Sequence, residues 1–381
     1  MRSLEILDRL IAFPTVSRDP NRDLIGYAAD LLSAIGADIT VIPDETGGKA
    51  NLYAILGPED QRGVMLSGHT DVVPVEGQTW TTDPFRLKEV EGRLYGRGTA
   101  DMKGFVASAL AAAERAAGRD LKTPLHIALS YDEEIGCVGV RSLVDMLAAA
   151  PVKPVFCIVG EPTTLAIATG HKGKTGLRSV VRGREGHSAL APMALNAIHV
   201  ATDFIGAIRA AQARIAAEGA QDGDYDVPYT TLHVGKISAG VALNIVPNRA
   251  DIEWEIRNVA ADDPAAILSD LEREAARIVA AAGDGAAIET AIFNAYPGLD
   301  TAPDSAIVAF MKSLTGANGT MKVAFGTEGG LFSGKVDVPT VVCGPGSMAQ
   351  GHKPDEFLER SQLEQCDSML DALIGRLEAG L

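Results

Sequence analysis

The chain has 381 residues, of which 46% are hydrophobic and 22% charged, a composition typical of a folded globular protein. Acidic residues outnumber basic ones by 50 to 34, and the net charge of −16 argues against nucleic acid or an anionic membrane as a partner. The length exceeds one ordinary core and predicts two domains, or one large α/β body with an insertion.

The cysteines and the N-terminus are typical of a cytoplasmic protein. Cys137, Cys157, Cys343 and Cys366 form no C-x-x-C pair, so neither a disulfide framework nor a thiolate zinc site is expected. The N-terminal segment MRSLEILDRLIAFPTVS reads as an amphipathic helix, because acidic residues interrupt the apolar run that a signal peptide needs. No later stretch reaches the ~18 apolar residues of a membrane span.

Helical patterns and short β runs alternate through the first part of the chain. Helices are expected over 3–13 and 23–35, from about Lys103, and over 138–149. Strands are expected over 37–42, 51–56, 63–68, 124–131 and 154–159. The apolar runs VMLSG and VFCIVG, separated by helices, predict a buried, mostly parallel sheet with helices on both faces.

The pattern changes at about residue 175, where a strand-helix-strand-strand-helix-strand order begins. Its segments are TGLRSVVRGR, 193–217, YTTLHVGKISAG, RADIEWEIR, 263–282 and 286–293. This order is typical of a self-contained ferredoxin-like α+β unit. A helix over 303–314, the strand VPTVVCG and a C-terminal helix from 361 then resume the first domain. We therefore expect an α/β domain made of 1–174 and 293–381, with an α+β domain, 175–292, inserted in it.

Five predicted strands each deliver a possible metal ligand at the carboxyl end. LSGHTDVVP places His69 and Asp71 two residues apart, so both side chains point to the same side of the strand. GRGTADMKG holds Asp101 in a glycine-rich turn before a helix, where helix capping is the alternative role. The other candidates are Asp132, Glu133 and Glu134 in SYDEEIG, Glu161 in VFCIVGEPT, and His352 in GPGSMAQGHKPDE. Because open α/β sheets bind ligands at the carboxyl ends of their strands, we expect one shared site.

The residue types favour a pair of metal ions. Three consecutive carboxylates repel one another unless a cation or a proton relieves them, although a solvated acidic turn is the alternative. Two histidines and several carboxylates without a thiolate favour zinc, with cobalt or manganese as substitutes. Five ligands exceed the three that one catalytic zinc keeps, so two ions sharing a carboxylate fit better and can activate a water near neutral pH.

The motifs HTDVVP, LYGRGTADMKG, DEEIG, GEPT, GHKGK, GREGHSA, NIVPN and GPGS-x-x-x-GHKPDE-x-L resemble the co-catalytic zinc aminoacylase and carboxypeptidase family. They occur in that family's order and cover essentially the whole chain. The family includes succinyl-diaminopimelate desuccinylases, carboxypeptidases for glutamate conjugates and acetylornithine deacetylases. Here WTTDPFRL, GTADMKGF, FGTEGGLF and GPGS…GHKPDEFLE are most similar to the acetylornithine deacetylases. The resemblance implies a zinc exopeptidase-like fold and a metal-dependent amidohydrolase that converts N-acetylornithine to ornithine and acetate in arginine biosynthesis.

The resemblance also assigns the metal ligands. It implies that one zinc is held by His69, Asp101 and Glu161, and the other by Asp101, Glu134 and His352, so that Asp101 bridges the two. A cis peptide after Asp101 belongs to the same pattern.

Further roles follow from the resemblance and from residue chemistry. The resemblance makes Glu133 the general base and acid, Asp71 the partner of the first histidine ligand, and His187 in GREGHSA a group that polarises the scissile carbonyl across a homodimer formed by the inserted domain. Asn244 in ALNIVPN is suited to donate to the same oxyanion or to a substrate carboxylate. Arg257, which ends EWEIR, is suited to bidentate carboxylate binding. The alternatives are a loop histidine for His187 and a surface salt bridge for Arg257.

Thr327 and Glu328 in FGTEGG are the clue to the substrate. A buried carboxylate beside the metal site would pair with the cationic side chain of ornithine, whereas a desuccinylase needs cations for its extra carboxylate. A dipeptidase, carboxypeptidase or general aminoacylase stays open, because a few pocket contacts decide between acyl groups. A metal-binding scaffold without catalysis is disfavoured by the presence of Glu133. A dinucleotide enzyme is disfavoured because GRGTAD lacks the third glycine and no helix follows GPGSMA.

Overall fold

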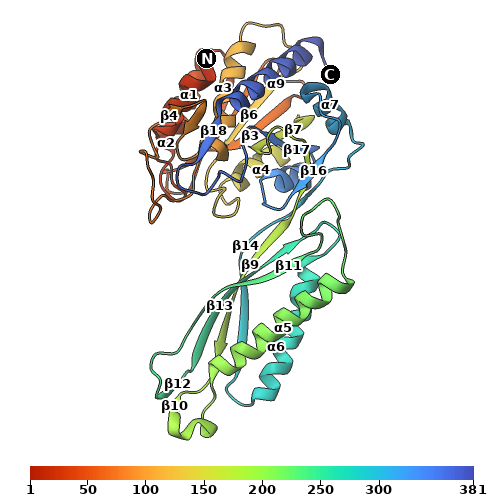
Figure 1. Ribbon diagram of the computed structural model, residues 1–381. Helices are drawn as coiled ribbons and strands as arrows, with labels where there is room; N and C mark the ends of the chain where they lie inside the picture. The colour runs from red at the N-terminus through yellow and green to blue at the C-terminus, as the bar shows by residue number, and fades with distance from the viewer. The chain divides into compact units, whose positions relative to one another are not determined.

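The computed structural model describes residues Met1–Leu381 and divides into two compact units (Figure 1). The first unit comprises Met1–His171, Leu299–Val323 and Thr327–Leu381, and the second comprises Lys172–Gly298 and Ala324–Gly326. The predicted insertion, 175–292, falls within the second unit, and its role in dimerisation stays a prediction. No helix combines the length and the apolar character that crossing a bilayer requires.

The first unit is built on a nine-stranded sheet with the order β1-β2-β6-β3-β7-β17-β8-β15 and with β16 beside β8. Its four central strands run parallel to one another: β6 (Leu125–Ser130), β3 (Val64–His69), β7 (Phe156–Pro162) and β17 (Thr340–Gly344). Every residue of these four strands is buried, which requires cover on both faces. The α/β fold with a mostly parallel central sheet is thus confirmed.

Shorter or antiparallel strands flank this parallel core. They are β1 (Asp38–Pro43), β2 (Ala50–Leu56), β8 (Ala168–His171), β15 (Leu299–Asp300) and β16 (Met321–Val323). A separate small sheet contains β4 (Lys88–Val90), β5 (Arg93–Tyr95) and β18 (Phe357–Glu359). Neither this small sheet nor the three strands beyond β17 were predicted, because strands of two to four residues carry too little periodicity to be recognised.

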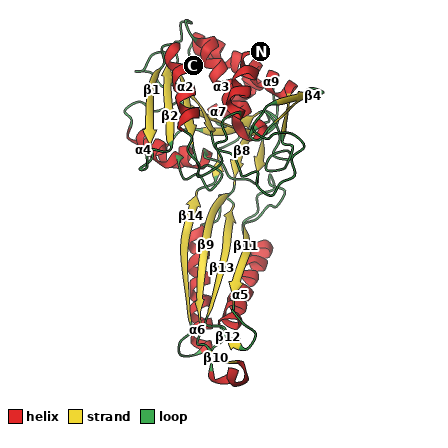
Figure 2. Ribbon diagram, turned by 90° about the vertical axis from the view of Figure 1, so that its left-hand side faces the viewer, coloured by secondary structure: helices red, strands yellow, loops and turns green.

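Helices lie on both faces of the main sheet (Figure 2). On one face, α3 (Gly104–Ala116) contacts β3, β6 and β7, and packs against α1 (Arg2–Ile11) and α9 (Arg360–Ala379). Successive side chains of β2 point to opposite faces of the sheet. Leu52 packs in the core that includes α3, whereas Asn51 donates to the backbone oxygen of Gly139, beside α4, at 2.8 Å. The remaining helices are α2 (Arg22–Ala34), α4 (Val140–Ala149), α7 (Ala306–Thr315), the short α8 (Gly329–Leu331) and the π-helical η3 (Phe332–Val336).

The second unit has the ferredoxin-like order expected from the sequence. Its antiparallel sheet, β11-β13-β9-β14, consists of β9 (Gly173–Arg182), β11 (Thr231–Ala239), β13 (Arg249–Asn258) and β14 (Ala287–Tyr296). Alternate residues of β13, including Ile252 and Trp254, are buried and pack with Phe204 of α5 (Ala197–Glu218). The second helix of the unit is α6 (Pro264–Ala282). One face of the sheet is therefore covered by helices.

The helix expected from residue 193 begins later. Asn196 caps α5, since its Oδ1 accepts the N–H of Ile198 at 2.9 Å, and the preceding Ser188–Met193 forms a 3-10 helix, η2. Near η2, β10 (Gly186–His187) pairs with β12 (Ile245–Val246) in a two-stranded ribbon.

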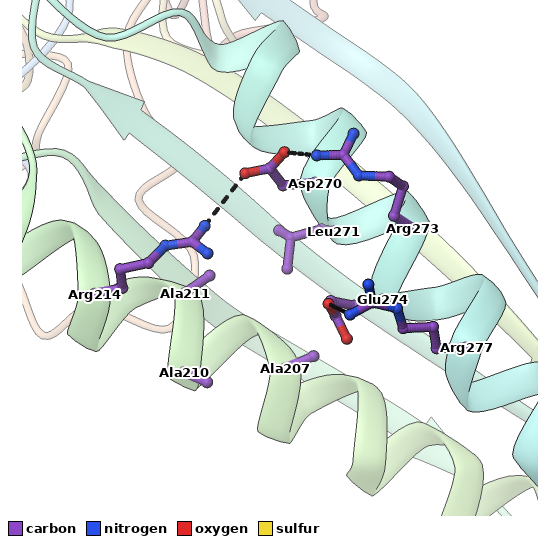
Figure 3. Close-up of a pocket in the computed structure, with 9 residues that line it drawn as sticks. All are labelled: Ala207, Ala210, Ala211, Arg214, Asp270, Leu271, Arg273, Glu274 and Arg277. Atoms are coloured by element: carbon purple, nitrogen blue, oxygen red, sulfur yellow. Dashed lines mark hydrogen bonds and ion pairs between the residues drawn. The ribbon is translucent and has the colours of Figure 1, made fainter.

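A hollow between α5 and α6 is lined mainly by alanines and ion pairs (Figure 3). Asp270 pairs with Arg214 and Arg273, and Glu274 pairs with Arg277. Because these arginines already have carboxylate partners on the same helices, the hollow offers no unpaired charge for a ligand.

Candidate active site

The predicted ligands of the first unit meet at the carboxyl ends of its central strands. His69 is the last residue of β3, Glu161 lies in β7, and Glu133 and Glu134 lie in the turn that follows β6. His352 lies in the loop after β17, and its side chain is 48% exposed, whereas those of His69 and Glu161 are buried. Parallel neighbouring strands end at one rim of the sheet, so residues distant in the sequence become neighbours.

Asp101 reaches this rim by a different route from the one expected. It follows no strand of the main sheet but lies in a π-helical turn, η1 (Thr99–Lys103), between β5 and α3. The peptide between Asp101 and Met102 is cis, as the resemblance implies. No side-chain cap is formed at the start of α3. Instead, Asp101 Oδ1 lies 3.1 Å from His69 Nε2, and Oδ2 lies 3.1 Å from His352 Nε2. One carboxylate thus faces both histidines.

The spacing of these atoms fits two sets of metal ligands that share Asp101. His69 Nε2 lies 3.5 Å from Glu161 Oε1, and His352 Nε2 lies 3.0 Å from Glu134 Oε2. Ligand atoms placed roughly 2.0–2.1 Å from a tetrahedral ion are about 3.3 Å apart, close to these separations. In addition, Glu161 Oε2 is buried without a hydrogen-bond partner, which is costly unless a cation takes the free lone pairs.

Glu133 and Glu134 differ in their partners. Carboxylate oxygens of both approach the ligand cluster: Glu133 groups with His69 and Glu161, and Glu134 with His69 and Asp101, within 4.8 Å. Glu134 also reaches the second histidine of the site, whereas Glu133 Oε1 accepts the Cys137 thiol at 3.2 Å. Glu134 therefore has the better ligand geometry, and Glu133 stands beside the cluster with one oxygen oriented by a neutral donor.

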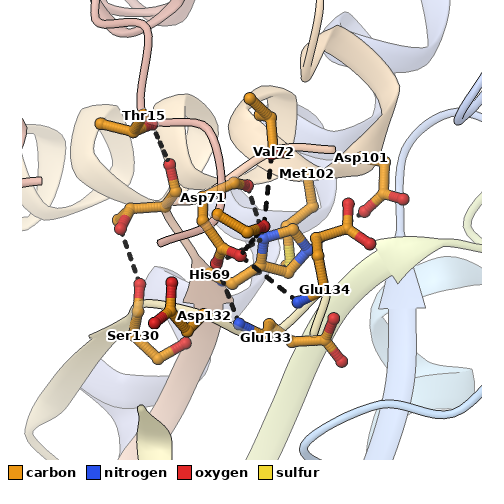
Figure 4. Close-up of polar contacts among 12 residues, drawn as sticks. Thr15, His69, Asp71, Val72, Asp101, Met102, Ser130, Asp132, Glu133 and Glu134 are labelled. Atoms are coloured by element: carbon orange, nitrogen blue, oxygen red, sulfur yellow. Dashed lines mark hydrogen bonds and ion pairs between the residues drawn. The ribbon is translucent and has the colours of Figure 1, made fainter. Parts of the chain in front are cut away.

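Asp71 anchors the acidic turn and the first histidine (Figure 4). Its Oδ1 accepts the N–H of Glu133 at 3.0 Å, and its Oδ2 accepts the N–H of Glu134 at 3.3 Å and the Ser17 hydroxyl at 2.7 Å. His69 Nδ1 lies 2.9 Å from the backbone oxygen of Asp71, which leaves Nε2 directed at the other ligands. Such contacts set the ring orientation of a metal-binding histidine.

The third acid of the run, Asp132, is directed elsewhere. Its Oδ2 pairs with Lys49 Nζ at 2.5 Å, and its Oδ1 accepts the N–H of Arg18 at 2.7 Å. The pattern of residues did not distinguish it from its two neighbours, and only the resemblance left it without a role, because the cation that neutralises it lies far away along the chain.

Burial and mutual repulsion dominate the electrostatics of the cluster. Burial raises the pKa of Glu133 and Glu161 well above the usual range for a carboxyl group, and neighbouring carboxylates add to this shift while His69 opposes it. Burial and then Asp101 raise the pKa of Glu134 to about 7. Hydrogen bonds to Asp101 and Glu134 raise the pKa of His352 to about 10. The site thus concentrates carboxylates in excess of its own cations, and divalent ions would relieve that excess.

Comparison with known proteins agrees with this geometry. Residues 65–376 match the peptidase family M20/M25/M40. The chain belongs to this family. It is 34% identical to an acetylornithine deacetylase of Proteus mirabilis (strain HI4320), over 97% of this chain and 95% of that protein. The predicted family and the prediction of a metal-dependent hydrolase are therefore confirmed.

Solved structures share the fold at low sequence identity. An M20 metallo-carboxypeptidase from Sulfolobus solfataricus has a TM-score of 0.79 at 18% identity and covers 100% of both chains. A dinuclear metal-binding M20 peptidase from Bacillus subtilis has a TM-score of 0.68 at 16% identity and covers 98% of this chain and 96% of its own. At such identities the likeness confirms the fold and leaves the substrate open.

Two buried charges of this M20 chain were missed as site residues. Arg97 and Glu356 are each 1% exposed, and Arg97 Nη1 donates to Glu356 Oε2 at 2.7 Å. Both lie inside motifs that carry the family resemblance, LYGRGTADMKG and GHKPDE. A charged residue within such a motif was the sequence feature that could have indicated a role at the site. Lys103 is also fully buried and donates to the backbone oxygens of Leu10 at 3.1 Å and Phe13 at 2.8 Å.

Glu328 is the buried carboxylate that the sequence predicted, and it is 1% exposed. Its Oε2 accepts the Ser67 hydroxyl at 3.3 Å, and its Oε1 accepts the Ser130 hydroxyl. Burial raises its pKa to about 7. Thr327 Oγ1 accepts the N–H of Gly329 at 3.0 Å and so shapes the turn. A substrate cation would compete with the two serine hydroxyls for Glu328.

The other three predicted residues belong to the second unit, which does not bring them all together. His187 lies in β10, and the exposed Asn244 directly precedes β12, the partner of β10 in the ribbon. Arg257 lies near the carboxyl end of β13, far along the strand from this ribbon. It donates to Glu255 Oε1 at 3.1 Å and to the Tyr296 hydroxyl at 3.1 Å.

Proposed function

We propose that this M20 hydrolase removes the acyl group from an N-acyl amino acid, with N-acetylornithine as its substrate and ornithine and acetate as products, a step of arginine biosynthesis. The observation that carries the proposal is the carboxylate of Asp101, which faces both histidines, with the carboxylate of Glu133 close to His69. Near full-length identity of 34% to an acetylornithine deacetylase supports the substrate.

Zinc is the proposed metal, with cobalt or manganese as substitutes, because the donors are imidazole nitrogens and carboxylate oxygens without thiolates. His69, Asp101 and Glu161 would hold one ion, and Asp101, Glu134 and His352 the other. When bound, such ions neutralise the carboxylates, polarise the scissile carbonyl and lower the pKa of the attacking water.

Glu133 is the proposed general base and acid. Its carboxylate takes a proton from the water as the water oxygen bonds to the amide carbon, and then gives that proton to the leaving nitrogen as the C–N bond breaks. Burial raises the pKa of Glu133, which makes its carboxylate a stronger base for the first transfer. Asp71 supports this step by fixing the backbone N–H of Glu133.

A homodimer through the second unit is proposed to complete the site with His187 and Asn244, which would donate to the developing oxyanion. Large apolar side chains near these two residues support an interface, since solvent exposure of such a group is unfavourable. They are Leu243, 100% exposed, Val241, 87% exposed, and Met193, 75% exposed. Arg257 is proposed to bind the α-carboxylate of the substrate.

A panel of substrates tests the proposal. Zinc-loaded protein is assayed with N-acetylornithine, N-succinyl-diaminopimelate, N-acetylmethionine and dipeptides, and the ratio kcat/KM is compared. N-acetylornithine is expected to give the highest value. A higher value for a dipeptide or for the succinylated substrate would retain the hydrolase and refute the substrate.

A further inference from the structure

Two of the proposed metal ligands, Asp101 and His352, lie neither in a strand of the main sheet nor in the turn that follows β6. His69 and Glu161 lie within buried strands, but Asp101 lies in the turn η1 and His352 lies in a loop. The backbone of His352 has a φ of 60°, in the left-handed region that non-glycine residues seldom adopt. Other contacts must therefore hold the turn and the loop at the spacing that a shared ion requires.

The side chain of Glu356 holds the turn. It is 1% exposed, and its Oε1 accepts the N–H groups of Ala100 at 2.9 Å and Asp101 at 3.1 Å. The backbone oxygen of Glu356 accepts the N–H of Gly96 at 3.0 Å. Since Glu356 follows His352 by four residues, the chain that carries one ligand directly fixes the backbone of the other.

Arg97 holds the loop from the opposite side. Its Nη1 donates to Glu356 Oε2 at 2.7 Å and to the Lys353 backbone oxygen at 3.3 Å. Its Nη2 donates to Gln78 Oε1 at 2.5 Å, and Gln78 Nε2 donates to the backbone oxygen of His352 at 3.0 Å. The loop is thus bound at its histidine and at the residues that follow it by one guanidinium and the amide that it orients.

We propose that Arg97 and Glu356 are positioning residues, which set the distance between Asp101 and His352 and thereby the affinity of the ion that both would bind. This inference rests on the proposed two-metal function. A buried ion pair contributes little net stability after desolvation, so its value here lies in geometry. The ion at His69 and Glu161 depends less on the pair, because two of its three proposed ligands lie in β-strands and only the shared Asp101 does not.

The experiment compares zinc binding by wild type, Glu356→Gln and Arg97→Lys, using equilibrium dialysis with elemental analysis. Glu356→Gln keeps the shape but removes the charge, and Arg97→Lys keeps a charge but loses the fork that reaches three acceptors. Each variant is expected to weaken the more weakly bound ion about 10- to 100-fold, the range for partners that orient ligands, and to change the tighter ion about threefold at most.

The fluorescence of Trp80 gives a second measure of zinc binding, because the centre of its ring lies 5.0 Å from the Arg97 guanidinium carbon. In a Trp254→Phe background Trp80 is the single tryptophan, since the chain has two. Zinc titration followed by its fluorescence should show a midpoint at higher zinc in both variants.

Tyr53→Phe is the matched control, because it removes a buried hydrogen bond to His126 in the same unit without touching the turn or the loop. It should lower stability and leave both zinc affinities unchanged. Wild-type zinc binding in Glu356→Gln and Arg97→Lys, or equal weakening of both ions in all three variants, would overturn the inference. A wild type that binds no second ion would instead refute the two-metal function.

Discussion

Replacing Glu133 by glutamine is the sharpest test of the proposed chemistry. The amide has the same shape, and the backbone contacts that fix this residue remain: Asp71 still accepts its N–H at 3.0 Å, and its own oxygen still accepts the N–H of Gly136 and Cys137, each at 2.7 Å. Only the capacity to exchange a proton is lost. General acid–base groups contribute about 10²- to 10⁴-fold in rate, so kcat should fall by that factor. The corresponding increase of the activation barrier is about 3–5.5 kcal/mol.

The assay combines steady-state kinetics on N-acetylornithine with elemental analysis of the same preparation. Zinc content should stay at the wild-type level, and KM should change much less than kcat. Asp132→Asn is the control from the same acidic run, because Asp132 pairs with Lys49 and not with the site; it should reduce stability and largely keep kcat. Near-normal turnover of Glu133→Gln would refute its role as base, and loss of zinc together with turnover would identify Glu133 as a ligand.

Three further predictions follow from the same contacts. His69→Ala and His352→Ala should each lose zinc on dialysis, with His352→Ala keeping the ion of the strand-borne ligands; retention of full zinc content in both would contradict the ligand assignment. Glu328→Gln should raise KM for N-acetylornithine far more than for N-acetylmethionine. Equal effects on both substrates would show that Glu328 has a structural role, through Ser67 and Ser130, and does not bind the substrate cation. Burial lowers the pKa of His126 from 6.5 to about 4. Between these two pKa values the unfolded chain binds a proton at His126 and the folded chain does not. The free energy of unfolding should therefore fall as the pH falls from 6.5 to about 4, by about 3 kcal/mol at most. Urea unfolding at pH 7 and pH 5 measures the part of this loss that lies above pH 5, about 2 kcal/mol, and His126→Gln should abolish it.

Local patterns in the sequence were sufficient for the larger elements and for the positions of most of the proposed ligand residues. Strands such as β3 and β7 are apolar throughout, and an apolar run between helices predicts a buried parallel strand wherever it occurs. The position of His69 at the end of such a run predicts that it lies at the rim. The same reasoning placed Glu161 and the acidic turn after β6 correctly, because parallel strands expose their carboxyl ends at one edge.

Contacts between distant segments could be decided only by the tertiary structure. Asp101 reaches the rim from a turn outside the main sheet, Asp132 turns away toward Lys49, and Arg97 meets Glu356 across a separation of 259 residues. A sequence records which residues are charged, but periodicity acts over a few residues and cannot say which charges become partners. That depends on how the core packs, since burial brings the partners together and makes an unpaired charge costly.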